Sequence, residues 1–328
     1  MPALPTLAAL VTVVFWASAF VGIRAAGEDL SPGALALGRL LVGTALLGLF
    51  VLARREALPS RRDLPLIAFA GVLWLGVYNV ALNAGEQHVD AGTAAMIVGV
   101  GPVLIAVLAG LLLGEGFPRR LLVGCAVAFV GVAVIGVATS TSDALGSTGA
   151  LLCLLAAATY AVAVVVQKPI AGRVSALQTT FLLCVAGTLF CAPFAPSLVR
   201  EAGDASTANL LWTVYLGVFP TALGFTTWTY ALKRTTAGRL GVTTYLVPPI
   251  SITLGWLLLE ETPPALALAG GALCLAGVAI SRYERRLRGS RSATRSRSSA
   301  PPTQSDSQRS TASNSVSSAA TAFPTKTP

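Results

Sequence analysis

Residues 102–118 read PVLIAVLAGLLLGEGFP, and residues 248–264 read PPISITLGWLLLEETPP. The second stretch repeats the first after a shift of 146 residues without a gap, with a leading proline, three leucines, a glutamate and a final proline at the same spacing. The paired positions are Ala91-Gly92 with Ala237-Gly238, Pro102 with Pro248, Leu111–Leu113 with Leu257–Leu259, Glu115 with Glu261, Pro118 with Pro264, Gly124 with Gly270, and Gly131–Ala133 with Gly277–Ala279. Because proline, glutamate and glycine rarely align by chance, the chain contains an internal duplication.

The duplicated stretch belongs to a longer series of apolar segments. A helix rises about 1.5 Å per residue, so about 20 apolar residues cross a hydrocarbon layer of about 30 Å. Ten segments reach this length, and they occupy residues 7–26, 33–53, 65–84, 93–113, 119–138, 149–168, 177–195, 209–231, 240–259 and 265–282. With 54% hydrophobic and 11% charged residues and a mean hydropathy of +0.74, a soluble domain could not bury the apolar surface. We predict an all-α polytopic membrane protein with ten transmembrane helices.

The charges between these segments alternate in sign along the chain. Every second loop is basic, with the cations Arg54, Arg55, Arg61, Arg62, Arg119, Arg120, Lys168, Arg173, Lys233, Arg234 and Arg239. The intervening loops carry the acids Glu28, Asp29, Glu86, Asp90, Asp143, Glu201, Asp204, Glu260 and Glu261, with Arg200 as their one clear cation. Lysine and arginine stay on the cytoplasmic side of short loops, so both termini are expected in the cytoplasm.

Each copy of the duplication contains five of the predicted spans. Because five is an odd number, the second copy enters the membrane from the opposite side, and the chain is predicted to form two inverted five-helix repeats, residues 7–138 and 149–283. Inverted repeats have two mirror-related packings around a site near the midplane, so a bound solute can face one side and then the other. The duplication therefore predicts a secondary transporter that works by alternating access.

The end of the chain differs from the rest. Residues 289–328 are rich in Ser, Thr and Arg and have no apolar period, so we predict a disordered cytoplasmic tail. The net charge of +9 does not indicate nucleic-acid binding, because residues 282–328 contribute nine cations and two acids to it. The four clustered arginines of this region are suited to anionic lipid headgroups, and they are Arg282, Arg285, Arg286 and Arg288. We expect the lipid bilayer as a partner and no nucleic acid.

Several of these features together resemble a known family. Span one contains residues 15–20 (FWASAF), span two contains Arg39, and spans four and nine each have a proline followed by leucines and a terminal glutamate. Over residues 7–283 this pattern is similar to the EamA-type exporters of the drug/metabolite transporter superfamily. The resemblance implies a plasma-membrane carrier that exports amino acids and related metabolites through a central cavity, lined chiefly by spans one, three, four, six, eight and nine. The second copy reads Glu260-Glu261, which leaves the role of each acid open.

Polar side chains inside a bilayer face a cavity or a partner helix, since contact with lipid is costly. Two stripes have this character, and they consist of Asn79, Asn83 and Gln87 in span three and of Thr226, Thr229, Tyr230 and Lys233 in span eight. Because these spans are repeat mates, the stripes can face each other across a cavity that binds a small-molecule solute. Hydrogen bonding between helices is the alternative. Further cavity candidates are the aromatic residues Trp16, Tyr78, Tyr160, Trp228, Tyr245 and Trp256.

Arg39 is the one charge well inside a predicted span, about 9 Å from its outer end by helical rise. A central arginine costs about 2.5 to 3.5 kcal/mol in a transmembrane helix, so its charge needs a partner. Backbone carbonyls or a solute carboxylate can supply it. The alternative is that the side chain reaches outward to the membrane surface or bonds to a neighbouring helix.

Prolines and acids complete the predicted machinery. Prolines that interrupt helical hydrogen bonding are hinge candidates, with a fixed kink as the alternative, and they are Pro102, Pro220, Pro248 and Pro249. Every acid lies at or beyond the end of a span, so energy coupling is open. Glu86 on the outer side and Glu115 on the inner side are the candidates for proton coupling, while a facilitator or an exchanger fits the same residues.

Catalytic and metal-dependent classes find no support in the sequence. The chain lacks a Walker loop, so ATP is not the direct energy source, and it has a single histidine, His88. Its five cysteines lie in apolar spans without a Cys-x-x-Cys pair, so we expect no metal site and no cofactor. A membrane-embedded transferase, and a sensor or scaffold that signals through the tail, are the alternative classes. The solute, the transport direction and the choice between monomer and homodimer stay open.

Overall fold

The computed structural model describes residues 3–88, 94, 97–139, 148–259 and 264–282, with side chains except for residues 139, 255–259 and 282. These described residues form helices and contain no strand. By its internal contacts the chain separates into two units, Met1–Tyr283 and Glu284–Pro328. The predicted tail, residues 289–328, lies outside the described residues and stays a prediction.

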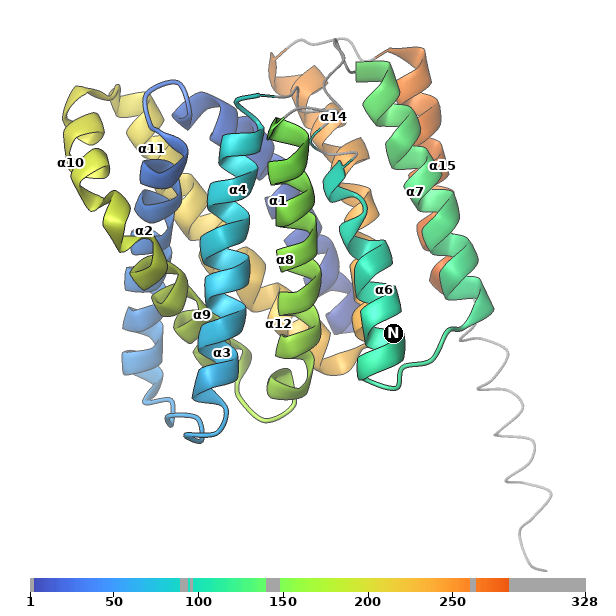
Figure 1. Cartoon of the computed structure of the whole chain (residues 1–328), viewed down its shortest axis with the longest axis horizontal. Coiled ribbons are helices and arrows are strands. Elements are labelled where there is room, and N and C mark those ends of the chain that lie inside the picture. Colours follow the sequence, from blue (N-terminus) through green and yellow to red (C-terminus); the bar gives the residue numbers. More distant parts are fainter. Residues whose placement is uncertain (1–2, 89–93, 95–96, 140–147, 260–263, 283–328) are drawn as a thin grey trace, which may run out of the picture. The chain divides into compact units, whose positions relative to one another are not determined.

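Helices make up most of the first unit (Figure 1). In chain order they are α1 (Ala3–Ala26), α2 (Pro32–Arg54), α3 (Leu64–Gly71), η1 (Val72–Val77), α4 (Tyr78–Gly85), α6 (Gly101–Leu112), α7 (Arg119–Thr139), α8 (Thr148–Ala171), α9 (Ala176–Cys191), η3 (Ala192–Phe194), α10 (Ala195–Asp204), α11 (Thr207–Leu216), η4 (Gly217–Gly224), α12 (Phe225–Arg234), α13 (Ala237–Thr243), η5 (Thr244–Leu246), α14 (Val247–Leu259) and α15 (Ala265–Arg282). The elements η1 and η4 are π-helical, and η3 and η5 are 3₁₀-helical.

Several consecutive helices join into longer segments. Across the described residues, seven segments are long and apolar enough to cross a membrane, and they are Ala3–Ala26, Pro32–Arg54, Leu64–Gly85, Arg119–Ala138, Thr148–Ala171, Ala176–Asp204 and Thr207–Arg234. Gly101–Leu112 and Ala265–Ser281 are shorter apolar helices. The prediction of an all-helical, polytopic membrane protein is confirmed. The number of ten crossings and their directions stay predictions.

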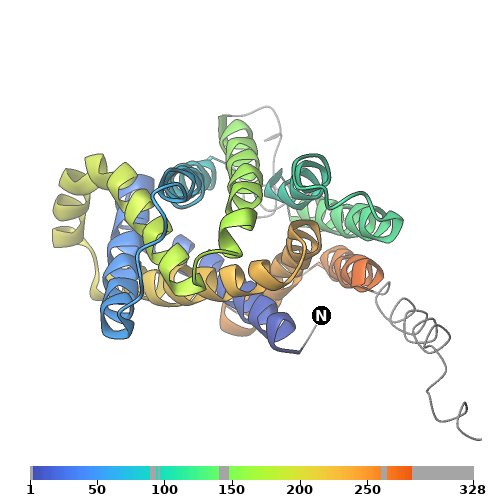
Figure 2. The same ribbon diagram turned by 90° about the horizontal axis from the view of Figure 1, so that it is seen from below.

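The two halves of the chain pack on each other through reciprocal contacts. Helix α1 packs on α12 as α8 packs on α4, α2 packs on η4 as α9 packs on η1, and α1 packs on α14 as α8 packs on α6. In each case the two contacts involve the corresponding helices with the halves exchanged. Helix α2 and its counterpart α9 lie side by side in both views (Figures 1 and 2). The duplication in the sequence is therefore accompanied by a duplicated packing arrangement.

The π-helical segments occupy equivalent places in the two halves. Residues 72–77 of η1 become residues 218–223 after the 146-residue shift, and η4 spans residues 217–224. A π-helical turn widens the helix and is frequent at functional sites. Each segment lies in the middle of a long helical segment, α3–η1–α4 or α11–η4–α12.

Helices α7 and α15 pack closely along their length (Figure 1). An ideal Cβ at Gly124 would lie 2.5 Å from the oxygen of Gly277, and one at Gly131 would lie 2.6 Å from the oxygen of Gly270. The numbering rises along α7 while it falls along α15, so the two helices are antiparallel. By the 146-residue shift, Gly124 corresponds to Gly270 and Gly131 corresponds to Gly277, so the two glycine contacts are equivalent. Glycine allows this approach because a side chain would meet the backbone of the other helix.

Two polar tethers connect loops of different halves. Arg173, after α8, donates from Nε and Nη2 to Oδ1 of Asp63, at 3.0 and 2.5 Å. Asp29, after α1, accepts hydrogen bonds from the backbone N–H of Ser206 and from Nδ2 of Asn209, at 2.9 and 2.8 Å. The hydrogen bond from Arg173 lowers the pKa of Asp63, and the Ser206 N–H lowers the pKa of Asp29. Both tethers join the loop after the first helix of one half to the loop before the third helical segment of the other.

Candidate functional site

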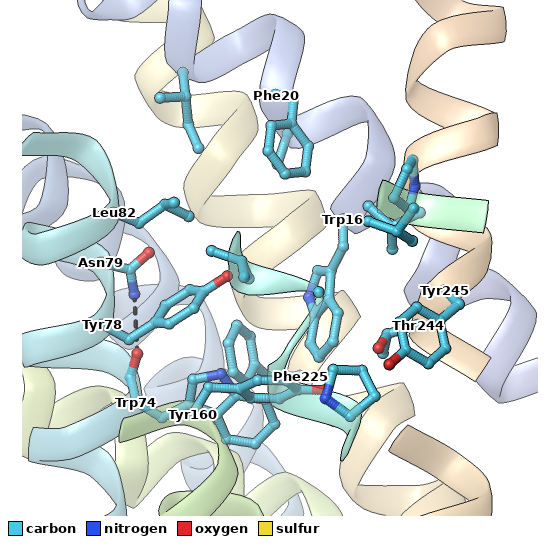
Figure 3. Close-up of a pocket in the computed structure, with 18 of the residues that line it drawn as sticks. Trp16, Phe20, Trp74, Tyr78, Asn79, Leu82, Tyr160, Phe225, Thr244 and Tyr245 are labelled. Carbon is cyan, nitrogen blue, oxygen red and sulfur yellow. Dashed lines mark hydrogen bonds between the residues drawn. The ribbon is translucent and has the colours of Figure 1, made fainter. Parts of the chain in front are cut away.

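A cavity, here called the aromatic cavity, lies between α1, α4, α6, α8, α12 and α14 (Figure 3). Its volume is about 110 Å³. Most of its lining is apolar or aromatic, and the lining residues are Trp16, Ala19, Phe20, Ile23, Arg39, Trp74, Tyr78, Asn79, Leu82, Val98, Gly99, Pro102, Val132, Tyr160, Phe225, Thr244, Tyr245, Val247 and Pro248. The cavity therefore resembles a small-molecule site, which is mostly apolar with a few polar groups.

Five aromatic rings pack together at one end of this cavity. This cluster, the aromatic floor, consists of Trp16, Trp74, Tyr160, Phe225 and Trp228. The ring centroids of Trp74 and Phe225 are 4.8 Å apart, and those of Trp16 and Trp228 are 5.0 Å apart. In Figure 3, Trp74, Tyr160 and Phe225 gather at one end of the cavity, and Phe20 and Leu82 lie at the other. Because Trp74 and Trp228 are each 1% exposed, the floor closes this end tightly.

Both π-helical segments contribute to the aromatic cavity. Trp74 belongs to η1, and the oxygen of Pro220, in η4, accepts a hydrogen bond from Nε1 of Trp16 at 3.3 Å. Thr221, also in η4, accepts a hydrogen bond from Nε of Arg39 at 3.1 Å. The widened turns therefore position the two side chains that come from α1 and α2.

Arg39 lies in α2, is 4% exposed and lines the aromatic cavity. Among the described residues, Thr221 is the one hydrogen-bond acceptor that the guanidinium of Arg39 has. A guanidinium has five N–H donors in a planar fork. Asn79, on α4, donates from Nδ2 to the oxygens of Trp74 and Leu75, at 3.3 and 3.0 Å. The cavity therefore contains one positive charge in otherwise neutral surroundings.

The structure places many of the predicted cavity residues together. Those that line the aromatic cavity are Trp16, Arg39, Tyr78, Asn79, Tyr160 and Tyr245. Trp228 lies in its floor. The side chain of Trp256 lies outside the described part of the chain, so its role stays a prediction.

Thr226, Thr229 and Tyr230 of the predicted stripe on span eight are not among the residues that line the aromatic cavity, and their role in a solute site stays a prediction. Thr229 donates to the Phe225 oxygen and accepts from Nε2 of Gln167 at 3.0 Å, while Thr226 donates to the Ala222 oxygen. The ring of Tyr230 packs under the guanidinium of Arg234, 3.6 Å from the ring centroid. These side chains are engaged within and between helices, which is the alternative that the sequence left open. Asn83 is also absent from the lining and faces a neighbouring cavity.

Three of the four hinge candidates lie in the first turn of a helix, and the fourth lies inside one. Pro102 is the second residue of α6, and Pro248 and Pro249 are the second and third residues of α14. A proline in the first turn of a helix removes no hydrogen bond, so these prolines start helices rather than break them. Pro220 lies inside η4, where the π-helical turn accommodates it. Pro102 and Pro248 line the aromatic cavity, and their role as hinges stays a prediction.

The two acids proposed for proton coupling have different environments. Glu115 accepts hydrogen bonds from the backbone N–H groups of Ala237 and Gly238, at 2.7 and 3.1 Å, so it caps the beginning of α13. Glu86 follows α4 and lines the neighbouring cavity. Burial raises the pKa of Glu86 to about 7, although Arg24 and Arg39 favour its ionised form. Glu86 is thus the acid that titrates near neutral pH; its coupling role stays a prediction.

Sequence reasoning missed several residues of the site, among them Trp74, Thr221, Phe225 and Thr244. An apolar aromatic residue such as Trp74 or Phe225 can face lipid, another helix or a cavity, and the sequence does not distinguish the three. The π-helical turns gave no signal either. Thr221 directly follows Pro220 in the sequence, and this was the one available hint of a widened turn.

Comparisons with known proteins agree with this architecture. The EamA-like transporter family matches twice, at residues 4–137 and 147–283. A "Probable terminal-alkyne amino-acid exporter" of Streptantibioticus cattleyicolor is 39% identical over 83% of this chain and 91% of its own length. An uncharacterized transporter of Bacillus subtilis is 33% identical over 80% of this chain and 86% of its own. A "Probable amino-acid metabolite efflux pump" of Salmonella typhimurium is 27% identical over 85% of this chain and 95% of its own.

The fold is also found among solved structures. One crystal structure superposes with a TM-score of 0.69 and 20% identity, over 85% of this chain and 96% of the other. At this identity the likeness concerns the fold alone. The two family matches together cover nearly all of the helical unit, one in each half of the duplication. The chain is a multi-pass membrane transporter, and it belongs to the EamA-like transporter family.

Proposed function

We propose that this chain is a secondary transporter that exports small amino-acid-like solutes across the plasma membrane by alternating access. The observation that carries the proposal is Arg39, whose buried guanidinium lines a mainly aromatic cavity. A guanidinium binds a carboxylate through two parallel hydrogen bonds. The names of two relatives, an exporter of terminal-alkyne amino acids and an efflux pump for amino-acid metabolites, agree with a solute that carries a carboxylate.

The rest of the cavity suits the rest of such a solute. Burial of an apolar side chain against the rings contributes about 25 cal/mol per Å² of buried area. Aromatic faces also attract a cation within about 6 Å of the ring centroid, so the ammonium group of the solute is tolerated beside the rings of Trp16 and Tyr78. A small zwitterion with a short apolar side chain is therefore the solute class that fits best.

The transport cycle uses two inverted five-helix repeats, residues 7–138 and 149–283, with both termini in the cytoplasm. The antiparallel packing of α7 on α15 and the reciprocal contacts between the halves support this arrangement. Two like halves of opposite direction have two equivalent packings, which open the cavity to opposite faces. In the present packing the aromatic floor closes one end of the aromatic cavity. In the other packing, each half adopts the arrangement that its counterpart has now, and this end opens.

Glu86 is the first residue to examine for energy coupling. Its pKa of about 7 allows it to take up and release a proton under physiological conditions. Glu115 caps α13 with both carboxylate oxygens, so it connects the end of α6 to the beginning of α13. A facilitator or an exchanger needs no proton uptake or release. Flux that persists unchanged after the proton gradient is collapsed would rule out proton coupling.

Counterflow in liposomes tests the proposed function. The full chain is reconstituted into vesicles loaded with unlabelled L-propargylglycine, and labelled L-propargylglycine is added outside. We expect transient accumulation of the label against its gradient, and none in protein-free vesicles. A membrane transferase or a scaffold moves no label in this way. Lack of counterflow by monodisperse, reconstituted protein, with this solute and with L-norvaline, would contradict the proposal.

A further inference from the structure

A second cavity adjoins the aromatic cavity at the end of α1, the beginning of α2 and the end of α4, and it is here called the Glu86 cavity. Its volume is about 230 Å³. Its polar residues are Arg24, Glu28, Asn83, Glu86 and Gln87. In contrast to the aromatic cavity, it is lined by both positive and negative side chains.

Two acceptor oxygens of this cavity have no hydrogen-bond partner among the described residues, and they are Oδ1 of Asn83 and Oε1 of Glu86. Asn83 is 4% exposed. Its Nδ2 donates to the oxygen of Pro32 at 3.1 Å, which fixes the amide so that Oδ1 is the unused acceptor. Asn83 and Glu86 are three positions apart at the end of α4, so they share a face. A buried acceptor without a partner costs about 1 to 3 kcal/mol, so this pair calls for a donor.

The charge of the cavity favours a cationic donor. Glu28 and Glu86 contribute two carboxylates against the single guanidinium of Arg24, so the cavity is negative when Glu86 is ionised. A primary ammonium has three N–H donors and one positive charge, which suits two neighbouring acceptors. A divalent metal ion would need about six oxygen ligands, and the described residues contain no cluster of three metal-binding side chains.

The two cavities are adjacent along α1 and α4. Ile23 lines both of them, and Asn79 of the aromatic cavity lies four residues before Asn83 on the same face of α4. We propose that the Glu86 cavity is a second solute site, in which Asn83 Oδ1 and Glu86 Oε1 bind the ammonium group of the solute as it passes to or from Arg39 and the aromatic rings. This inference rests on the proposed function, since it concerns the same solute.

Equilibrium binding of 4-pentyn-1-amine to the full chain in nanodiscs, measured by calorimetry, tests the site. This probe retains the ammonium and the alkyne of L-propargylglycine, lacks the carboxylate and has one more methylene between the two retained groups. Glu86→Gln and Asn83→Ala are each expected to weaken binding about tenfold or more, because a hydrogen bond to a charged group contributes about 1.5 to 3 kcal/mol. Glu86→Asp keeps the carboxylate and is expected to bind the amine more tightly than Glu86→Gln does.

The matched control is Asp204→Asn, which removes the same charge from an exposed position outside both cavities. We expect it to bind the amine as the unmodified chain does. Unchanged affinity in both Glu86→Gln and Asn83→Ala would overturn the site. Complete competition by NaCl or KCl at constant ionic strength would also overturn it, because an inorganic cation would then be the ligand.

The binding measurement is independent of transport. A chain that binds the amine through Glu86 but shows no counterflow of L-propargylglycine would support the ammonium site and contradict the proposed function. Counterflow together with an amine affinity that ignores Glu86 and Asn83 would contradict the site and leave the proposed function supported.

Discussion

Arg39 combines a buried position with a charge that proteins cannot remove, because a guanidinium stays protonated at physiological pH. A buried charge is costly unless its donors are paired. Thr221 accepts the hydrogen bond from Nε, and the cavity lies on the side from which a solute would approach. A solute carboxylate would therefore gain from a group that the fold already holds in place.

We expect Arg39→Gln to abolish counterflow of L-propargylglycine in protein of normal abundance. Arg39→Lys is expected to retain only part of the flux, because lysine keeps the charge but lacks the planar fork. Arg200→Gln is the control, since Arg200 is exposed on α10. Unchanged counterflow in Arg39→Gln would assign Arg39 a structural role, as a partner of Thr221.

The pH dependence of amine binding is set by Glu86. Burial raises the pKa of Glu86 to about 7, so its carboxylate is ionised above that pH and protonated below it. A primary ammonium, with a pKa of about 10.4 in lysine, stays charged throughout this range. The affinity for 4-pentyn-1-amine is therefore expected to fall as the pH decreases through about 7.

Other charged or titratable groups near Glu86 are Arg24, Glu28, Arg39, Tyr78 and Cys153. If Glu86 governs the pH dependence of amine affinity, this dependence should disappear in Glu86→Gln, which keeps all of these neighbours. It should persist in Asp204→Asn. Calorimetry at several pH values measures both. A midpoint that survives in Glu86→Gln would assign the titration to one of these neighbours.

At the scale of elements, the contact between α7 and α15 depends on four glycines in two equivalent pairs. A Cβ on Gly131 would lie 2.6 Å from the oxygen of Gly270 and 2.7 Å from the nitrogen of Cys274, and backbone atoms cannot move aside as a side chain can. Overpacking of this kind costs about 1 to 3 kcal/mol. We expect Gly131→Ala and Gly277→Ala to lower the thermal denaturation midpoint in detergent by similar amounts.

Gly203→Ala is the control for these substitutions. Gly203 lies near the end of α10, and none of the other described residues comes within 4 Å of the position that a Cβ would take there. Alanine favours a helix over glycine by about 1 kcal/mol, so the midpoint should not fall. A midpoint of Gly131→Ala equal to that of the unmodified chain would show that α7 and α15 are not closely packed.

The π-helical segments are the elements that link the fold to the site. Because η1 supplies Trp74 and η4 supplies the acceptors for Trp16 and Arg39, a straight α-helix at either place would rotate these groups out of position. Proline explains η4, since Pro220 cannot donate a backbone hydrogen bond. In η1 there is no proline, so the packing of α9 against it, at the place where α2 packs on η4, is the corresponding constraint.

At the scale of the whole molecule, the central prediction is the opposite orientation of the two halves. Ala57 and Gly203 are equivalent positions by the 146-residue shift, and both are exposed. In intact cells we expect a membrane-impermeant maleimide to label Gly203→Cys, and to label Ala57→Cys only after permeabilisation. The five native cysteines are buried, so they should give little background. Labelling of both variants from the same side would contradict the inverted arrangement.

The sequence named several residues that line the aromatic cavity, but it could not tell a polar stripe that meets a cavity from one that meets another helix. Arg39 was found because an arginine inside a span is conspicuous, and it does line the aromatic cavity. The stripe of Thr226, Thr229 and Tyr230 looked equally suitable, but its hydrogen bonds are made within its own helix and to α8 and α9. A polar face on a membrane helix has the same spacing whether it meets a cavity or another helix.

The sequence by itself determined the membrane class, the series of apolar helices, the duplication and the family. These follow from helix length and from the cost of polar groups in lipid, which act on each segment separately. Only the tertiary structure decided that aromatic rings from α1, η1, α8 and α12 form one floor, that two helices widen beside it, and that Asn83 and Glu86 share a second cavity. Those contacts join residues far apart in the chain, and packing between helices sets them rather than any periodicity within one.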